Sequence, residues 1–173
     1  MEIESCTLSD LDMIMALYRE ATAYQKTKST SHWPEFDSEK IKKEIINGQH
    51  WKMLSDEKVI CIWAHTFSDP SIWGERNSDP AIYLHRICIN PDSRGKKLVN
   101  QVIEWAKRYA SQNEKMFVRL DTAGENQGLI KHYTGCGLTY LGLVYLRTPE
   151  DLPSHYHNTN ISLFEMKLED QRS

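Results

Sequence analysis

The chain has 173 residues, of which 40% are apolar and 10% aromatic, enough to bury one hydrophobic core of ordinary size. We therefore expect a single domain over residues 1–173. Lys and Arg number 21 against 24 Asp and Glu, and the formal net charge is -3, which argues against a dedicated DNA-binding or polybasic membrane-binding surface. The expected partners accordingly include neither nucleic acid nor a membrane.

Cysteine usage and the N-terminal residues indicate a cellular compartment. The four cysteines, Cys6, Cys61, Cys88 and Cys136, are widely spaced and form no C-x-x-C pair. Scattered reduced thiols are typical of cytoplasmic proteins. The chain opens with acidic residues where a signal peptide would be basic, and no apolar run approaches the roughly 18 residues that span a bilayer. We expect a soluble cytoplasmic protein.

The local pattern that most resembles a metal site is the pair His155 and His157, which follows Pro153. A metal site needs more converging ligands than two. We therefore expect no bound metal.

The first third of the chain predicts a strand and two helices. Residues 2–7 are compatible with a short strand, and Thr7–Asp10 supplies capping residues for a helix. Apolar side chains then recur at helical spacing, at Leu11, Ile14, Leu17, Tyr18 and Ala21. Asp37 can cap a second helix, which Asn47–Gly48 ends.

The period then changes from helical to alternating. Residues 49–54 and 58–67 are rich in β-branched and aromatic side chains and predict a hairpin. Residues 69–80 carry Asp-Pro at both ends and predict an ordered loop around Trp73. Residues 81–90 predict the next strand.

The second half alternates helices with strands. A long amphipathic helix is predicted from Arg94 onward, followed by a strand at 116–121 and a short helix at 126–134. Two strands, at about 138–147 and 161–168, complete the chain. Strands that are partly hairpin-connected and partly separated by helices predict an α/β fold with a mixed sheet and helices on both faces.

The turn between the strand at 81–90 and the long helix is basic. Arg94, Gly95, Lys96 and Lys97 place cationic side chains beside the unpaired N–H groups and the positive dipole end expected at a helix start. Such an arrangement can bind an anion. On this segment alone, a solvated basic turn explains the pattern equally well.

A second pattern lies after the strand at 116–121, where Asn126 is followed seven residues later by Tyr133 and then by Gly137–Leu138. In this order and spacing the two patterns resemble the GCN5-related N-acetyltransferase (GNAT) superfamily. Its pyrophosphate loop [QR]-x-x-G-x-[GA] is matched by residues 94–99, and its N-x(6)-Y motif by residues 126–138. The resemblance covers nearly the whole chain in element order, and its specific motifs lie within residues 84–138.

The resemblance implies a GNAT-like, mostly antiparallel central sheet of about seven strands with helices on both faces. It also implies acetyl-CoA as co-substrate, with the pantetheine arm in a V-shaped opening between the strands at 82–89 and 116–121. A backbone N–H near Cys88 would point at the thioester oxygen, where negative charge develops. The implied cofactor-binding residues are Ile87, Cys88, Ile89, Arg94, Gly95, Lys96, Lys97, Leu98, Val99 and Asn126.

The loop departs from the family pattern at two positions. Lys97 stands where the family has Gly, and Val99 where it has Gly or Ala. Both family residues allow the backbone to approach phosphate closely, so the added side chains are expected to narrow the site. The charge of Lys97 is expected to compensate in part.

Two residues are candidates for proton transfer. Tyr133 matches the general acid of the family, which protonates the leaving thiolate; the alternative is a core tyrosine. His85 is the first candidate for the base that deprotonates the acceptor amine, because its reference pKa of about 6.5 suits that task. A structural histidine is the alternative, and Glu75 is a rival base.

Several residues have competing structural explanations. Asn126 can cap the short helix or hydrogen-bond the cofactor arm. Arg119 and Asp121 share a strand face and predict a structural pair. A substrate pocket is predicted from residues that ordinary core packing also explains: Trp33, Trp73, Glu75 and Tyr83.

The resemblance and the motifs together predict an acetyl-CoA-dependent N-acetyltransferase that acts on a primary amine of a small molecule by direct attack. One alternative is a non-catalytic CoA-binding regulatory module of the same fold, which the departures in the loop favour. Another is a protein N-terminal or lysine acetyltransferase, which requires an open acceptor groove. The acceptor and the oligomeric state, with a homodimer among the alternatives, are left open by the sequence.

Overall fold

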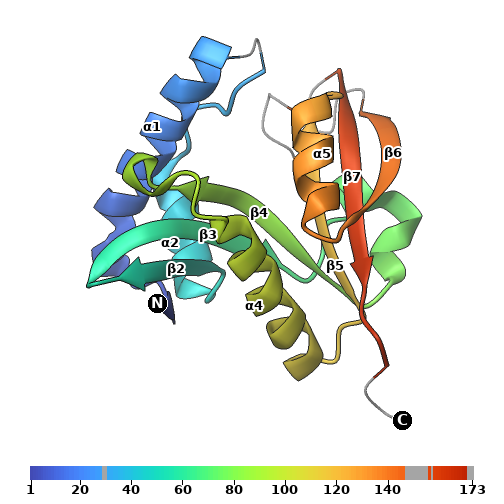
Figure 1. Cartoon of the computed structure of the whole chain (residues 1–173), viewed down its shortest axis with the longest axis horizontal. Coiled ribbons are helices and arrows are strands. Elements are labelled where there is room, and N and C mark those ends of the chain that lie inside the picture. Colours follow the sequence, from blue (N-terminus) through green and yellow to red (C-terminus); the bar gives the residue numbers. More distant parts are fainter. Residues whose placement is uncertain (29–30, 147–155, 157, 171–173) are drawn as a thin grey trace. The chain divides into compact units, whose positions relative to one another are not determined.

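The computed structural model describes residues 1–28, 31–146, 156 and 158–170. The strands are β1 (Glu2–Ser5), β2 (His50–Ser55), β3 (Lys58–Thr66), β4 (Ala81–Ile89), β5 (Phe117–Ala123), β6 (Thr139–Leu146) and β7 (Thr159–Lys167). The α-helices are α1 (Leu11–Lys28), α2 (Ser38–Ile46), α3 (Pro70–Trp73), α4 (Leu98–Gln112) and α5 (Gln127–Gly135). Short 3-10 helices form at η1 (Leu8–Asp10), η2 (Gly74–Ser78) and η3 (Pro91–Ser93). Figure 1 labels these elements.

The strands form one seven-stranded sheet in the order β1-β2-β3-β4-β5-β7-β6. The chain divides into two compact units, and β4 contributes residues to both. The first unit contains Met1–His65 and Arg86–Leu98, and the second contains Thr66–His85 and Val99–Ser173. The expected mixed, mostly antiparallel sheet of about seven strands is confirmed.

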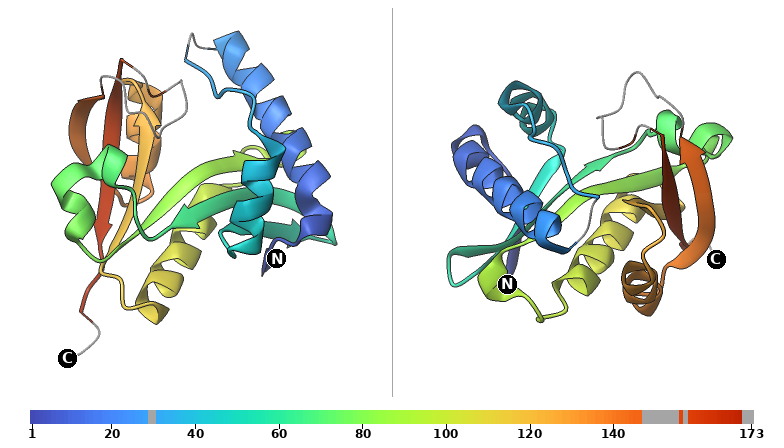
Figure 2. Two further views of the ribbon diagram at one scale, coloured as in Figure 1. Left: turned by 180° about the vertical axis from the view of Figure 1, so that it is seen from behind. Right: turned by 90° about the horizontal axis from the view of Figure 1, so that it is seen from above.

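In the first unit, β1, β2 and β3 are joined by antiparallel pairing. Helices α1 and α2 bury their apolar stripes against the strands (Figure 2). The core contains side chains from both helices and from β3 and β4, among them Ile14, Leu17, Ile41, Ile45, Ile62 and Cys88. The predicted capping of α2 by Asp37 is confirmed, because its carboxylate accepts a hydrogen bond from the backbone N–H of Glu39 at 3.0 Å.

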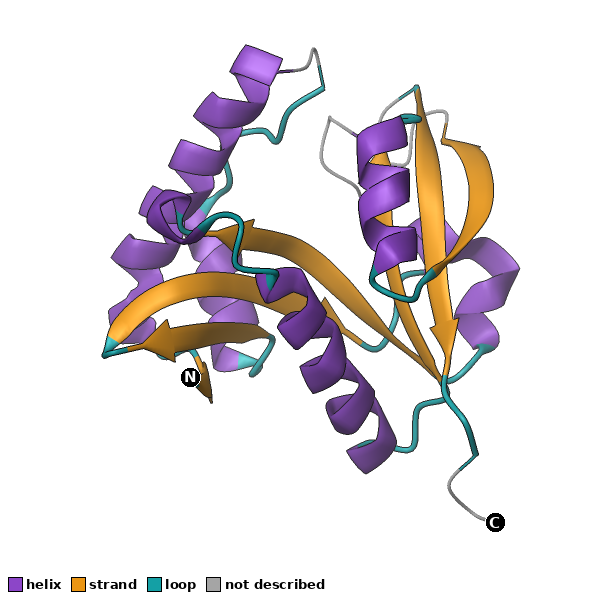
Figure 3. Ribbon diagram, viewed as in Figure 1, coloured by secondary structure: helices purple, strands orange, loops and turns teal. Residues whose placement is uncertain are grey.

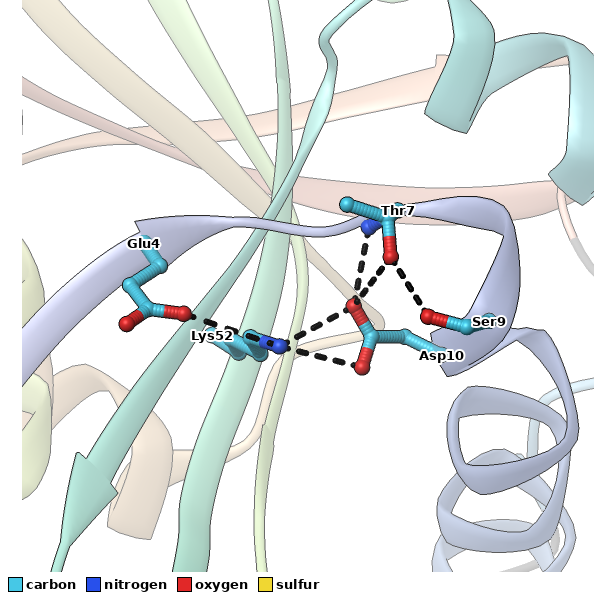
Figure 4. Close-up of polar contacts among 5 residues, drawn as sticks. All are labelled: Glu4, Thr7, Ser9, Asp10 and Lys52. Atoms are coloured by element: carbon cyan, nitrogen blue, oxygen red, sulfur yellow. Dashed lines mark hydrogen bonds and ion pairs between the residues drawn. The ribbon is translucent and has the colours of Figure 1, made fainter. Parts of the chain in front are cut away.

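The turn from β1 into η1 is fixed by polar contacts (Figure 4). Asp10 accepts a hydrogen bond from the backbone N–H of Thr7 at 2.8 Å, which confirms the predicted capping role of this segment. Lys52 of β2 donates to the Asp10 carboxylate at 3.0 Å and lies 3.7 Å from a carboxylate oxygen of Glu4. One lysine thereby ties two strands to the entry of α1.

In the second unit, β4 pairs in parallel with β5, from Ala81 opposite Phe117 to Leu84 opposite Leu120. Strand β5 pairs antiparallel with β7, and β7 pairs antiparallel with β6. Figure 3 shows these three strands side by side, with α5 along them. The core of this unit contains Ile72, Trp73, Ala81, Tyr83, Leu146, Ile161 and Leu163.

Two predicted elements differ from the structure. The long helix begins at Leu98 rather than Arg94, because Gly95 and Lys97 have φ of +83° and +53°, which a right-handed helix excludes. The expected loop at 69–80 instead folds into α3 and η2, where Pro70 takes a first-turn position in which its missing N–H costs no hydrogen bond. Within the described ranges, no helix is both long and apolar enough to cross a membrane.

Candidate active site

The basic turn that precedes α4 is exposed. Arg94, Gly95, Lys96 and Lys97 lie at the surface between η3 and Leu98. A Cβ built on Gly95 would meet no atom within 4 Å, so the backbone there is open to a ligand. Arg94 lies over the ring of Tyr24, with its guanidinium carbon 4.0 Å from the ring centroid. Cationic side chains and an accessible backbone before a helix start fit an anion such as a phosphate.

The two departures from the family loop have different structural consequences. Lys97 has the left-handed conformation that glycine adopts at no steric cost, and its side chain is exposed. The backbone of this chain at position 97 is therefore one that glycine could also adopt, and the lysine side chain is exposed to solvent. Val99 is only 5% exposed, so its side chain packs into the protein instead of extending over the surface of the loop.

Strand β4 changes its backbone course at Arg86, which has φ of +49°. The next three residues, Ile87, Cys88 and Ile89, were predicted to pair with the pantetheine arm. Cys88 is buried, and its Sγ lies 3.5 Å from the carbonyl oxygen of Leu17. Burial raises the pKa of the Cys88 thiol to about 12, so this thiol is protonated at neutral pH and is a poor nucleophile. Ile87 and Ile89 are half-buried.

Tyr133 lies on α5 and is half-buried, with its ring centroid 5.3 Å from that of Phe164 on β7. Its ring therefore packs on the sheet without being enclosed in the core. Asn126 caps α5, because its side-chain oxygen accepts a hydrogen bond from the backbone N–H of Leu129 at 3.1 Å. Of the two roles considered for Asn126, the structure shows the capping role.

His85 lies near the middle of β4 and is half-buried. Its Nε2 is 2.8 Å from the hydroxyl of Thr66, and that hydroxyl donates to the carbonyl oxygen of Ser68 at 3.1 Å. The Thr66 hydroxyl has one hydrogen, so it gives that hydrogen either to Ser68 or to His85; in the first case it accepts from His85, and Nε2 carries the proton of the neutral imidazole. The basic lone pair of that tautomer is on Nδ1.

Two aspartates that the sequence analysis did not identify as site residues lie beside His85. One carboxylate oxygen each of Asp69 and Asp121 and one ring nitrogen of His85 lie within 4.8 Å of one another. All three side chains are half-buried. The parallel register that ends at Leu84 and Leu120 places His85 and Asp121 at equivalent positions of adjacent strands, and this register is not visible in the sequence.

The carboxyl groups of this cluster are hard to ionise. Burial raises the pKa of Asp121 to about 7; the negative charge of Asp69 adds to the rise, and a 3.2 Å hydrogen bond from the Tyr156 hydroxyl opposes it. Burial likewise raises the pKa of Asp69 to about 6. Both groups therefore exchange protons near neutral pH, as acid–base catalysis requires.

The expected pair between Arg119 and Asp121 is wrong. Arg119 is buried and donates instead to Asp79 at 2.6 Å and to Glu165 at 2.8 Å. The same guanidinium donates to the hydroxyl of Tyr83 at 3.1 Å. Residues 119 and 121 share a strand face, but carboxylates from other segments are better placed to reach the guanidinium.

The predicted pocket residues occupy different surroundings. Trp73 and Tyr83 are 4% and 1% exposed, with ring centroids 5.6 Å apart, which favours core packing. Trp33 is half-buried in the first unit and packs edge-on against Tyr18 at 5.9 Å. Glu75 is exposed on η2. His155 and His157, considered as a metal site, lie outside the described residues.

Comparisons with known proteins identify relatives of the same fold. The N-acetyltransferase YesJ of Bacillus subtilis (strain 168) is 24% identical over 141 residues, which cover 77% of this chain and 78% of that protein. A GNAT-family acetyltransferase structure from Listeria monocytogenes 4b F2365 is similar with a TM-score of 0.77 at 20% identity, covering 96% of this chain and 94% of the other.

A putative acetyltransferase from Salmonella typhimurium, solved with its cofactor acetyl-CoA, has a TM-score of 0.70 at 12% identity and covers 100% of this chain and 96% of that one. These structures share the fold. The sequence profile of the Acetyltransferase (GNAT) family matches residues 14–138, which include the basic turn, His85, Asp121 and Tyr133. The chain belongs to the Acetyltransferase (GNAT) family.

Proposed function

We propose that this acetyltransferase transfers the acetyl group of acetyl-CoA to a primary amine of a small molecule, by direct attack of the amine on the thioester. Family membership makes the chain an acyltransferase that depends on acetyl-CoA. The exposed side chains of Arg94, Lys96 and Lys97 would hold its phosphates, because charge-assisted hydrogen bonds to phosphate are strong and the adjoining backbone is accessible.

The half-buried Tyr133 on α5 is the observation that carries the proposed mechanism. The reaction releases a thiolate whose conjugate acid has a pKa of about 8.5, so a proton donor accelerates cleavage of the C–S bond. In our proposal the Tyr133 hydroxyl donates this proton. The phenol stands at the position where the N-x(6)-Y motif of the family has its acid.

The acceptor amine, with a pKa of about 10, is protonated at neutral pH and must lose a proton before it attacks. We assign this step to His85. The 2.8 Å contact between Nε2 and the Thr66 hydroxyl supports the assignment, because it orients the imidazole; in our proposal Nε2 is the donor and Nδ1 is the basic nitrogen. The rival Glu75 is exposed on η2 and is not part of the cluster of His85, Asp69 and Asp121.

Replacement of Tyr133 by Phe tests the proposal. If the phenol donates a proton, Tyr133→Phe lowers kcat about 10- to 1000-fold and leaves acetyl-CoA affinity nearly unchanged. Thiol release over a panel of amines measures kcat, and isothermal titration measures binding. The control is Tyr145→Phe, which removes a hydroxyl from an exposed tyrosine of β6 and should retain full activity. An unchanged rate in Tyr133→Phe would remove the acid role, and no acetyl-CoA binding at millimolar concentration would refute the function.

A further inference from the structure

The two carboxylates beside His85 are not balanced by a neighbouring cation in the described part of the chain. Asp69 and Asp121 take part in no ion pair with a described lysine or arginine. Arg119, the buried arginine of the same unit, is bound to Asp79 and Glu165. Like charges at such a separation are unfavourable in partly buried surroundings, so the pair requires either protons or a positively charged ligand.

The fold itself holds this unfavourable arrangement in place. Asp69 begins α3, where the Trp73 N–H donates to its backbone carbonyl at 3.0 Å, and its own N–H donates to the Asn77 side chain at 2.6 Å. Asp121 lies within β5, whose pairing with β7 continues on both sides of it. These bonds fix the backbone of both residues, so both side chains start from positions close to His85.

We propose that Asp69 and Asp121 act with His85 in accepting the acceptor's ammonium group and removing its proton, and that their negative charge restricts acceptors to amines without an adjacent carboxylate. This inference rests on the proposed function and extends it to the class of substrate. The ammonium group supplies a positive charge that no lysine or arginine of the described residues brings into an ion pair with Asp69 or Asp121, and it also carries the proton that His85 must remove.

Each proton in the proposed reaction has a donor and an acceptor. The ammonium gives one proton to Nδ1 of His85, leaving a neutral amine and an imidazolium that the neighbouring carboxylates stabilise. The amine nitrogen then bonds to the thioester carbon, and the C–S bond breaks. The nitrogen loses a second proton, which replaces the one that Tyr133 gives to the thiolate. One proton in total passes from His85 to solvent.

The class of acceptor follows from the charges. An ammonium without a carboxylate adds only positive charge to the cluster, whereas an α-amino acid brings a third negative charge close to Asp69 and Asp121. Repulsion between like charges in a partly buried site is strong enough for a preference of about tenfold or more. Simple cationic amines are therefore the expected acceptors.

The test compares matched amines and matched variants of the full chain. The amine pairs are butylamine with 2-aminopentanoate, and phenethylamine with phenylalanine, each pair differing by one carboxylate. We expect kcat/KM at least about tenfold higher for the member without the carboxylate. Asp121→Asn should lower kcat/KM for the amine about 100-fold and reduce this preference, and Asp69→Asn should act in the same direction. Glu104→Gln, which removes an exposed carboxylate from α4, is the control.

The pH profile separates a chemical role from a structural one. The titratable groups that face the pair are His85 and Tyr83 of β4 and Tyr156, and Arg119 with Asp79 lies beyond Tyr83. Loss of one carboxylate should lower the apparent pKa of the basic group in the profile of kcat/KM, because the imidazolium loses a stabilising charge. A fall in rate with an unchanged profile would indicate a structural role and overturn the proposal.

Binding of the amine is measured separately, so that the inference does not depend on turnover. Butylammonium chloride is titrated into the CoA complex while the ring signals of His85, assigned with His85→Gln, are followed by NMR. The signals should shift in the wild type, shift less in Asp121→Asn, and remain in place with 2-aminopentanoate. No shift with butylammonium would overturn the inference, and so would activity that EDTA abolishes and Zn²⁺ or Mn²⁺ restores. Failure of acetyl-CoA binding would instead refute the proposed function.

Discussion

Each unit contains a histidine beside carboxyl groups, Glu44 in the first unit and Asp69 with Asp121 in the second, and the pKa shifts of these carboxyl groups have opposite signs. In the first unit Glu44 accepts hydrogen bonds from His50, at 2.7 Å, and from Arg86. Burial works to raise the pKa of Glu44, but the hydrogen bond from His50 and the charge of Arg86 prevail and lower it. In the second unit, burial raises the pKa values of Asp69 and Asp121, and the charge of Asp69 adds to the rise at Asp121.

The comparison shows that charge balance, more than residue type, separates a structural cluster from a chemical one. A carboxylate held by an arginine remains ionised over the physiological range and stabilises the fold. A pair of carboxylates without a described cation exchanges protons near pH 7, which is useful for catalysis and unfavourable for stability.

The largest expected effect is on the stability of the cluster of Glu44, His50 and Arg86. Glu44→Ala leaves the half-buried guanidinium of Arg86 without its carboxylate, and we expect the free energy of unfolding to fall by about 3 kcal/mol. Chemical denaturation measures the change. The control Glu39→Ala, on the same helix, removes an exposed partner of Lys42 and should cost about 0.5 kcal/mol or less. Equal losses in the two variants would contradict a structural role for the Glu44 cluster.

A smaller effect on stability, of the opposite sign, is expected when a carboxylate is removed from the cluster of Asp69, His85 and Asp121. The folded chain retains a proton on Asp121 up to about pH 7, whereas an unfolded aspartate loses it near pH 3.9, so the contribution of this group to stability falls as pH rises between these values. Asp121→Asn removes this loss of stability with rising pH, because asparagine does not ionise. Its Tm should match the wild type near pH 4 and exceed it by about 2–4 °C at pH 8, measured by calorimetry.

A Tm for Asp121→Asn below that of the wild type at pH 8 would show that Asp121 stabilises the fold, and the contrast between the clusters would fail. The same measurement on Asp79→Asn provides the matched control, because this carboxylate is paired with Arg119. That variant should be less stable than the wild type at pH 8.

The smallest effect concerns exposed charges, which solvent screens. Lys97→Gly and Lys97→Asn both remove the charge, and both residues tolerate the φ of +53° at this position. Each should weaken acetyl-CoA binding about three- to tenfold at low salt and less at high salt, as measured by isothermal titration. Unchanged or tighter binding would mean that the lysine side chain obstructs the site. Lys26→Ala, an exposed lysine of α1, is the control.

Local patterns in the sequence predicted most of the elements. The caps at Thr7 and Asp37, the hairpin of β2 and β3, and the helix that contains Tyr133 are determined by neighbouring residues, so they were predicted correctly. The start of α4 differs from the prediction because Lys97 has a left-handed backbone, and a lysine in the sequence does not indicate that conformation. The short helix α3 was missed because four residues are too few for a periodic pattern.

The sequence by itself determined the family motifs and the nature of each reactive side chain. Only the tertiary structure decided which charged groups are neighbours. Arg119 binds Asp79, which follows η2, and Glu165 of β7, whereas Asp121 lies beside Asp69 and His85. The physical reason is that electrostatic interactions depend on distance in space and on burial. Strand pairing and helix packing set both quantities between residues that are far apart in the chain.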